Sequence, residues 1–403
     1  MPWRGDRGSI STDVLVALVV CPWGDLDARG AAWSPQERLW WLLWSQVPGL
    51  GFGRLCQLWG VFGSLEEAWA APREALAAVP GIGPARLAAI ERCRRRGGDD
   101  PLAPLRHTGV LLPGDRALPA AVKALVRPPI HLYWRGRGQL WSPLRRGLAV
   151  AVVGTRRPSV HGLQMAEAIG HALAQAGWPV VSGLAEGIDA AAHQGCLRAD
   201  GRPIGVLGTP LDRVYPSHHA RLQQQVATRG LLISEQAPGS RVCAGHFAAR
   251  NRLQVALVRA VVLVECPEPS GALHAARLAW DQGLRLWVVP ADAAKTSAVG
   301  SNRWLAAGAA PLLNPSDLIA TLGPGPLAAG SGPRPASGPR AAAPAAAAIA
   351  ADQALLAAVG SGASLEQLSL HLGQAAAQLM PRLLALELAG VLQAEPGLQW
   401  RPA

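Results

Sequence analysis

Lysine is almost absent from this 403-residue sequence, which contains only Lys123 and Lys295. Neither belongs to a Walker-type loop, and no complete dinucleotide fingerprint is present, so we expect no ordinary nucleotide cofactor. The net charge is nevertheless +11, because arginine supplies nearly all of the 38 basic residues against 27 acidic ones. Arginine binds phosphate through two parallel hydrogen bonds, which favours a nucleic-acid partner. A GC-rich genome also explains this composition, including 15 Trp beside 2 Tyr, and both explanations stay open.

Cysteine pairs and long apolar runs are also missing. The 6 cysteines form no Cys-x-x-Cys pair and no histidine lies at zinc-like spacing, so we expect no metal, no cofactor and a reduced, cytoplasmic chain. No run reaches the roughly 18 apolar residues of a membrane span, so no membrane partner is expected. Residues 14–21 are apolar, but they follow Asp6 and Asp13 and precede no small-residue cleavage site. We therefore expect residues 1–34 to form a poorly ordered N-terminal extension.

The length of the chain suggests two or three domains, and the first, residues 35–97, is expected to be helical. It contains an internal repeat, in which residues 47–55 (Val-Pro-Gly-Leu-Gly-Phe-Gly-Arg-Leu) recur as residues 79–87 (Val-Pro-Gly-Ile-Gly-Pro-Ala-Arg-Leu). Both copies resemble the turn of a helix-hairpin-helix unit, whose backbone amides and nearby arginine can hold a DNA phosphate. Two purely structural hairpins explain the repeat equally well.

Residues 98–320 alternate short apolar runs with helical segments, which predicts a doubly wound, Rossmann-like and mostly parallel sheet. Ligands of such sheets bind at the carboxyl ends of the strands. The expected strands are Val110–Leu112, Leu148–Val153, Pro179–Ser182, Ile204–Leu207, Leu231–Ser234, Val261–Val264 and Leu286–Val289. The expected helices between them include Gly162–Ala176, Ala190–Ala199, Ala220–Thr228 and Gly271–Gln282.

The last part of the chain divides into a linker and a small module. Residues 321–348 are almost wholly Gly, Pro, Ala, Ser and Arg, which predicts a flexible linker. Residues 349–403 predict three helices, at 349–359, 364–372 and 375–389, and a terminal β-hairpin, which together resemble a winged helix. The third helix carries only Arg382 and Glu387 as charged residues. A protein contact or simple packing is therefore favoured over base readout.

Two glycine-containing turns follow expected strands of the α/β domain. Gly154-Thr155-Arg156-Arg157 offers a tight turn, a hydroxyl, two guanidinium groups and the amides of a helix start, all suited to phosphate. Ser182-Gly183 begins a second turn of this kind. Asp189 and His193 then share one helix face, as an acid–base or metal pair or as a hydrogen-bonded pair that holds the loop. The second interpretation is favoured, because no third ligand or nucleophile lies nearby in sequence.

The next candidate site combines Phe247 with Arg250, Asn251 and Arg252. An aromatic ring beside guanidinium groups suits a single strand, whose bases stack on the ring while arginines follow the phosphates. A core phenylalanine with surface arginines is the alternative. Ser270-Gly271 starts a further helix after a strand and offers another anion-holding helix terminus.

Taken together, these motifs resemble the DNA-processing protein DprA/Smf family. The matching segments are residues 152–159, 182–193, 206–216, 250–252, 270–273 and 300–303. The resemblance covers residues 98–320 throughout, and the flanking domains are similar to those of family members with three parts. It implies a bacterial cytosolic protein that binds single-stranded DNA in natural transformation, dimerises through its Rossmann-like domain and loads the RecA recombinase.

The matching motifs also imply site residues. The DNA-phosphate groove would include Arg156, Ser182, Gly183, Arg250, Asn251 and Arg252, with Phe247 near a base. The chain departs from the family at Ala249, where an arginine is usual, and at Pro290-Ala291, where Pro-Gly is usual. The lost charge is expected to weaken DNA binding without changing its mode.

The sequence therefore predicts a binding protein and not an enzyme. The main rival is a nucleoside-monophosphate hydrolase on the same scaffold, which needs a catalytic glutamate in the helix that begins near Ser270. Residues 270–276 contain none. A third alternative is a scaffold that docks proteins through its terminal modules.

Overall fold

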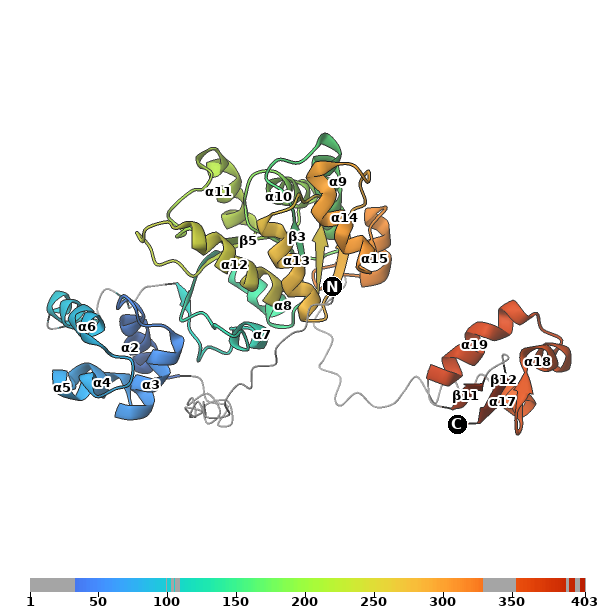
Figure 1. Cartoon of the computed structure of the whole chain (residues 1–403), viewed down its shortest axis with the longest axis horizontal. Coiled ribbons are helices and arrows are strands. Elements are labelled where there is room, and N and C mark those ends of the chain that lie inside the picture. The colour runs from blue at the N-terminus through green and yellow to red at the C-terminus, as the bar shows by residue number, and fades with distance from the viewer. Residues whose placement is uncertain are drawn as a thin grey trace, which may run out of the picture. The chain divides into compact units, whose positions relative to one another are not determined.

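The computed structural model describes residues 33–98, 100–102, 105, 109–328, 353–388, 391–395 and 399–402. The chain forms two compact units, Met1–Gly330 and Ser331–Ala403, and Figure 1 shows both. Most of the predicted N-terminal extension and linker lies outside the described residues. Among the helices described, none combines the length and the apolar character needed to cross a membrane.

The first unit begins with a group of helices. They are α2 (Pro35–Ser45), α3 (Phe52–Phe62), α4 (Leu65–Ala70), α5 (Arg73–Ala77) and α6 (Pro84–Gly97). Ser34 and Glu37 form a capping box that starts α2. The buried indole of Trp41 donates to the Ile130 carbonyl at 2.7 Å. His131, whose pKa burial lowers to about 4, bonds the Ser45 hydroxyl at 3.0 Å and the Glu235 carbonyl at 3.0 Å. These contacts join the helices to the sheet that follows.

The repeated segments form two hairpins with the same backbone geometry. Gly49 and Gly81 have φ values of 83° and 81°, in the left-handed region. The Arg86 guanidinium donates to the carbonyl of Gly49 at 3.0 Å and to that of Gly81 at 2.6 Å. One arginine of the repeat is therefore used within the helical domain, to join the two turns. Contact of these hairpins with DNA stays a prediction.

Replacing Gly81 with alanine is expected to lower the free energy of unfolding by about 1–2 kcal/mol, because an L-residue is strained at this φ. Urea unfolding followed by tryptophan fluorescence measures the change. Gly53→Ala is the control, since Gly53 lies in α3 and an added Cβ there meets no atom within 4 Å. Equal stability of the Gly81→Ala and Gly53→Ala variants would show that the hairpin tolerates a side chain.

The rest of the first unit is an α/β domain around a 9-stranded sheet of order β1-β2-β6-β5-β4-β3-β7-β8-β9. The strands are β1 (Val110–Leu111), β2 (Leu132–Gly136), β3 (Val150–Val153), β4 (Val180–Ser182), β5 (Pro203–Leu207), β6 (Leu231–Ser234), β7 (Ala260–Leu263), β8 (Arg285–Val288) and β9 (Ala310–Pro311). All neighbouring pairs among β3 to β9 are parallel. At one edge of the sheet, β2 pairs antiparallel with β6, and β1 pairs antiparallel with β2. The predicted mostly parallel sheet is confirmed; β2 and β9 were not predicted.

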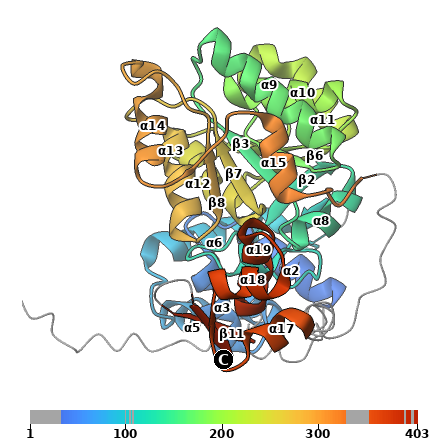
Figure 2. The same ribbon diagram turned by 90° about the vertical axis from the view of Figure 1, so that its right-hand side faces the viewer.

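Helices cover both faces of the sheet (Figure 2). They are α7 (Ala120–Lys123), α8 (Trp141–Arg145), α9 (Val160–Gln175), α10 (Ile188–Arg198), α11 (Ala220–Arg229), α12 (Ala244–Ala256), α13 (Gly271–Asp281), α14 (Val299–Ala306) and α15 (Pro315–Leu322). Alternate residues of β3 enter different cores: Val150 and Val152 pack with α9 and α10, whereas Ala151 and Val153 pack with α12 and α13. Burial on both faces explains why the parallel strands are continuous apolar runs.

Ordered contacts of the α/β domain continue beyond residue 320. Helix α15 ends at Leu322, and the amides of Gly325 and Leu327 donate to the carbonyls of Ala176 and Gly177 at 2.7 and 3.0 Å. The first residues of the predicted linker therefore pack against the end of α9.

The second unit contains α17 (Gln353–Val359), β10 (Ala363–Ser364), α18 (Leu365–Leu372), α19 (Ala376–Leu388), β11 (Leu392–Glu395) and β12 (Gln399–Pro402). Its strands form an antiparallel sheet of order β10-β12-β11. Ser364 and Gln367 form a capping box that starts α18. In α19, Arg382 donates to the Gln374 side chain at 2.8 Å, so this cation contacts its own module. The comparison with a winged helix stays a prediction.

Candidate nucleic-acid interface

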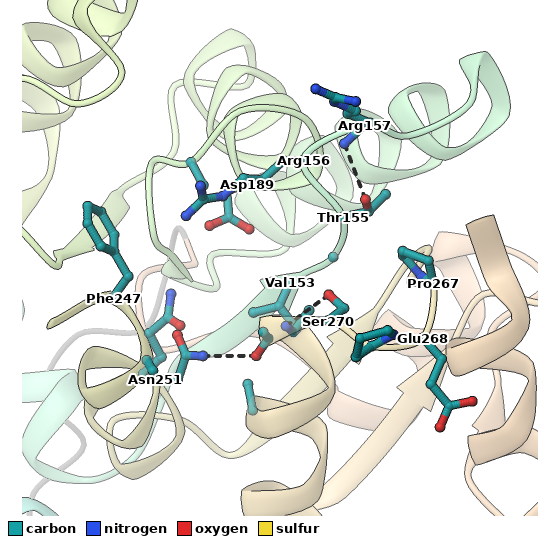
Figure 3. A pocket seen from close by; sticks show the side chains of 18 of the residues that line it. Val153, Thr155, Arg156, Arg157, Asp189, Phe247, Asn251, Pro267, Glu268 and Ser270 are labelled. Atoms are coloured by element: carbon teal, nitrogen blue, oxygen red, sulfur yellow. Dashed lines mark hydrogen bonds between the residues drawn. The ribbon is translucent and has the colours of Figure 1, made fainter. Parts of the chain in front are cut away.

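The strand order of the sheet reverses at β3, which is its topological switch point. Strands β4 to β6 extend to one side of β3, and β7 to β9 extend to the other. The loops after β3 and β7 therefore separate toward opposite faces of the sheet, which is where open α/β sheets bind ligands. A pocket of about 750 Å³ opens at this point. Figure 3 shows Phe247 and the segment from Pro267 to Ser270 on opposite sides of it.

The pocket brings together most of the residues that the sequence singles out. Those that line it are Gly154, Thr155, Arg156, Arg157, Phe247, Arg250, Asn251, Ser270 and Gly271. Three predicted site residues, Ser182, Gly183 and Arg252, lie outside this lining. Motifs up to 117 residues apart in the sequence thus meet at one place, as 271 and 154 do.

The loop after β3 presents two arginines to solvent. The Thr155 amide donates to the Glu265 carbonyl at 2.7 Å, and its hydroxyl accepts from the Arg157 amide at 3.2 Å. Thr155 is buried, so its hydroxyl shapes the turn. Gly154 is required by close packing, since a Cβ there would lie 2.6 Å from Ile188 Cγ1. The loop is thereby fixed with the Arg156 and Arg157 side chains exposed.

The second turn lies beneath the surface. The Ser182 hydroxyl is fully buried and donates to the Val152 carbonyl at 2.7 Å. Gly183 leaves room for the Arg250 guanidinium, which a Cβ at that position would overlap. Arg250 is only 7% exposed and donates to the Val206 carbonyl at 2.6 Å. These three residues therefore build the floor under the site, and Arg250 is its buried cation.

Asp189 is the buried acid near this cation. Its carboxylate accepts from the Gly183 amide at 3.0 Å. Burial raises the pKa of Asp189, and the charge of Arg250 opposes that rise. Burial, with the charge of Arg250, lowers the pKa of His193 to about 3, so His193 is neutral at physiological pH. The described part of the chain has no hydrogen bond between Asp189 and His193, so Asp189 holds the loop through the backbone instead of through the predicted pair.

The two residues after Arg250 have structural partners as well. Asn251 accepts from Arg250 Nε at 3.1 Å and donates to the Gly271 carbonyl at 3.0 Å, which ties α12 to the start of α13. Arg252 makes a two-pronged ion pair with Glu235, at 2.9 and 2.6 Å. Its charge is therefore neutralised away from the pocket.

The second lysine of the chain lies in the loop after β8 and contacts Glu265 in the loop after β7. Lys295 donates to the Ser159 hydroxyl at 2.7 Å and lies 3.3 Å from the Glu265 carboxylate. Burial acts to raise the pKa of Glu265, but hydrogen bonds from Ser297 and Ser159 outweigh it and the pKa is lowered. Ser270 caps α13 by accepting from the Ala272 amide at 3.3 Å. The negative charge of Glu265 is thus neutralised by Lys295 within the protein.

The arrangement suits an extended anion. Arg156 lies over the Phe247 ring, with its Cζ 5.7 Å from the ring centroid, and no acidic side chain pairs with it in the described residues. The start of α13 adds the partial positive charge of a helix N-terminus on the other side of the pocket. No group of three or more His, Cys, Asp or Glu side chains able to hold a metal occurs among the residues described.

The α/β domain that contains the pocket matches a known protein family. Residues 109–323, which include the whole pocket, match the family model described as DNA recombination-mediator protein A. The chain belongs to this family. The predicted membership of the DprA/Smf family is thereby confirmed, and the match covers the α/β domain.

Relatives within the recombination-mediator family extend the match. Protein Smf of Synechocystis is 38% identical over 292 residues, covering 71% of this chain and 73% of that protein. DNA processing protein DprA of Bacillus subtilis is 31% identical and covers 55% of this chain and 74% of its own. The X-ray structure of DprA from Streptococcus pneumoniae matches with a TM-score of 0.60 and 25% identity, covering 70% of this chain and 97% of that one.

The sequence analysis missed Gln254, which lines the pocket, and Tyr215, which lies outside the lining beside Phe247. Gln254 lines the pocket, is 1% exposed, and its amide nitrogen has no hydrogen-bond partner in the described residues. It lies four residues after Arg250 in α12, so helical spacing was an available signal. Tyr215 lies 5.0 Å from Phe247, ring centroid to centroid. It belongs to the 206–216 motif, but nothing local marks it as exposed.

Proposed function

We propose that the protein binds single-stranded DNA across the carboxyl ends of the central strands, with little sequence preference. The observation that carries the proposal is Arg156, a solvent-exposed arginine at the mouth of the switch-point pocket with no acidic partner in the described residues. Phosphates would bind Arg156 and Arg157, and aromatic rings beside them would take bases. The family's description as a recombination mediator supports DNA as the anion.

A gel-shift titration across salt, with one oligonucleotide in single-stranded and duplex form, tests this function. We expect tighter binding of the single strand and a linear fall in log affinity with log salt, with a slope of about −0.7 per phosphate contact. Release of ribose 5-phosphate from nucleoside monophosphates would support the hydrolase instead. If neither the single strand nor the duplex binds at low salt, the remaining hypothesis is a scaffold that docks proteins through its terminal modules.

We also propose that the protein protects incoming DNA in natural transformation and passes it to the RecA recombinase. The support is the family description together with the sequence-tolerant mode of binding, which leaves any strand available for recombination. RecA assembly on a single strand coated by a single-strand-binding protein, followed by fluorescence, is expected to accelerate when the protein is present.

A homodimer through the α/β domain is the third part of the proposal. Trp280 of α13 is 40% exposed and its ring centroid lies 5.5 Å from that of Trp304 of α14. The ion pairs Arg277–Asp281 and Arg303–Glu268 line the same hollow as the two rings, so charges of both signs lie beside them, which suits a self-complementary two-fold contact. Light scattering of Trp280→Glu is expected to give half the mass of the native protein; an unchanged dimer mass would place the interface elsewhere.

A further inference from the structure

Tyr215 is an exposed ring at the same edge of the sheet as the pocket. The chain has 2 tyrosines, and they differ sharply: Tyr133 is 3% exposed and Tyr215 is 46% exposed. Tyr215 lies in the loop that follows β5, just before the short helix Ser217–His219. The exposed face of this aromatic ring can take another planar group.

Phe247, by contrast, is packed from several directions. A Cβ on Gly208 would lie 2.8 Å from Phe247 Cδ1, so the ring lies directly over that glycine. The Tyr215 ring is 5.0 Å from it and the Arg156 guanidinium is 5.7 Å from it. These neighbours leave Phe247 only partly exposed. Its contacts suit a support for Tyr215 and Arg156 better than a free stacking face.

We propose that Tyr215 stacks on a base of the bound strand and that Phe247 acts as the positioning residue that holds Tyr215 beside Arg156. This inference rests on the proposed single-strand function. Strands β3, β4 and β5 are neighbours in the sheet. The bound DNA strand therefore runs from the loop after β3, across the end of β4, to the loop after β5. Arg156 binds a phosphate and Tyr215 takes a nearby base, whose identity matters little because every base has a planar face.

The test uses the full chain and two probes of 20 nucleotides. One is oligo-dT, and the other is an abasic strand with the same number of phosphates. Fluorescence anisotropy gives the affinity of native protein, Tyr215→Ala and Tyr215→Phe at several salt concentrations. We expect Tyr215→Ala to weaken oligo-dT binding by roughly 5- to 150-fold, with an unchanged salt slope and no effect on the abasic strand. Tyr215→Phe keeps the ring and is expected to bind as the native protein does.

Equal weakening on both strands, or no weakening on oligo-dT, would overturn the role of Tyr215. The proposed function would survive that result if Arg156→Ala still lowers the salt slope. Native protein that binds neither strand would overturn both. If Tyr215→Ala does not fold, Tyr215→Leu keeps apolar packing against Phe247 without the ring and gives the same comparison.

Discussion

Arg250→Ala is expected to lower the free energy of unfolding of the α/β domain by about 3–5 kcal/mol, the typical cost of removing one partner from a buried charge network. Arg250 is 7% exposed and donates to the Val206 carbonyl and to Asn251. Its charge also opposes the burial-driven rise in the pKa of Asp189. The substitution leaves a cavity, an unpaired carbonyl and an uncompensated buried acid.

Urea unfolding of Arg250→Ala beside Arg157→Ala measures this difference. Arg157 is exposed, and the contact described for it is made by its backbone amide, so its loss is expected to change stability by no more than about 0.5 kcal/mol. A stable Arg250→Ala variant with a reduced salt slope of DNA binding would contradict the buried role. It would instead support the phosphate contact that the sequence motif implies.

Arg156→Ala is expected to weaken single-strand binding by about tenfold or more and to reduce the salt slope by about 0.7 for one lost phosphate contact. Stability should change little, because Arg156 is exposed. The variant does lose its contact with the Phe247 ring. Titration of a fluorescent oligonucleotide at four or more salt concentrations gives both the affinity and the slope.

Arg285→Ala is the matched control for Arg156→Ala. It removes the same charge from the exposed first residue of β8, which lies at the amino end of the strands and so at the opposite edge of the sheet. Its salt slope is expected to equal that of the native protein. Equal reductions in the two variants would show that DNA responds to net charge alone and not to the pocket.

The sequence predicts the α/β fold well, because the strands buried on both faces are continuous apolar runs between helices. It does less well at the edge of the sheet. Strand β2 (Leu132–Gly136) is buried at its first residues and exposed at its last ones, so its sequence is not a continuous apolar run. Strand β9 is only two residues long and owes its place to pairing with β8. Such strands depend on tertiary contacts more than on local pattern.

The sequence also locates the pocket but does not distinguish the roles of the arginines in its motifs. Arg156, Arg250 and Arg252 look alike in their motifs, yet the structure makes them an exposed cation, a buried cation and a paired cation. That difference depends on partners distant in sequence, such as Val206 and Glu235. Phe247 likewise needs Gly208 and Tyr215 to define its surroundings.

Amide hydrogen exchange of the full chain, with and without a saturating single-stranded oligonucleotide, tests the central claim most directly. The account predicts slowed exchange in residues 154–157 and 268–272, which line the pocket, and little change with the duplex at the same concentration. Protection confined to the hairpins at 47–51 and 79–83, or to residues 353–402, with none at the pocket, would contradict it.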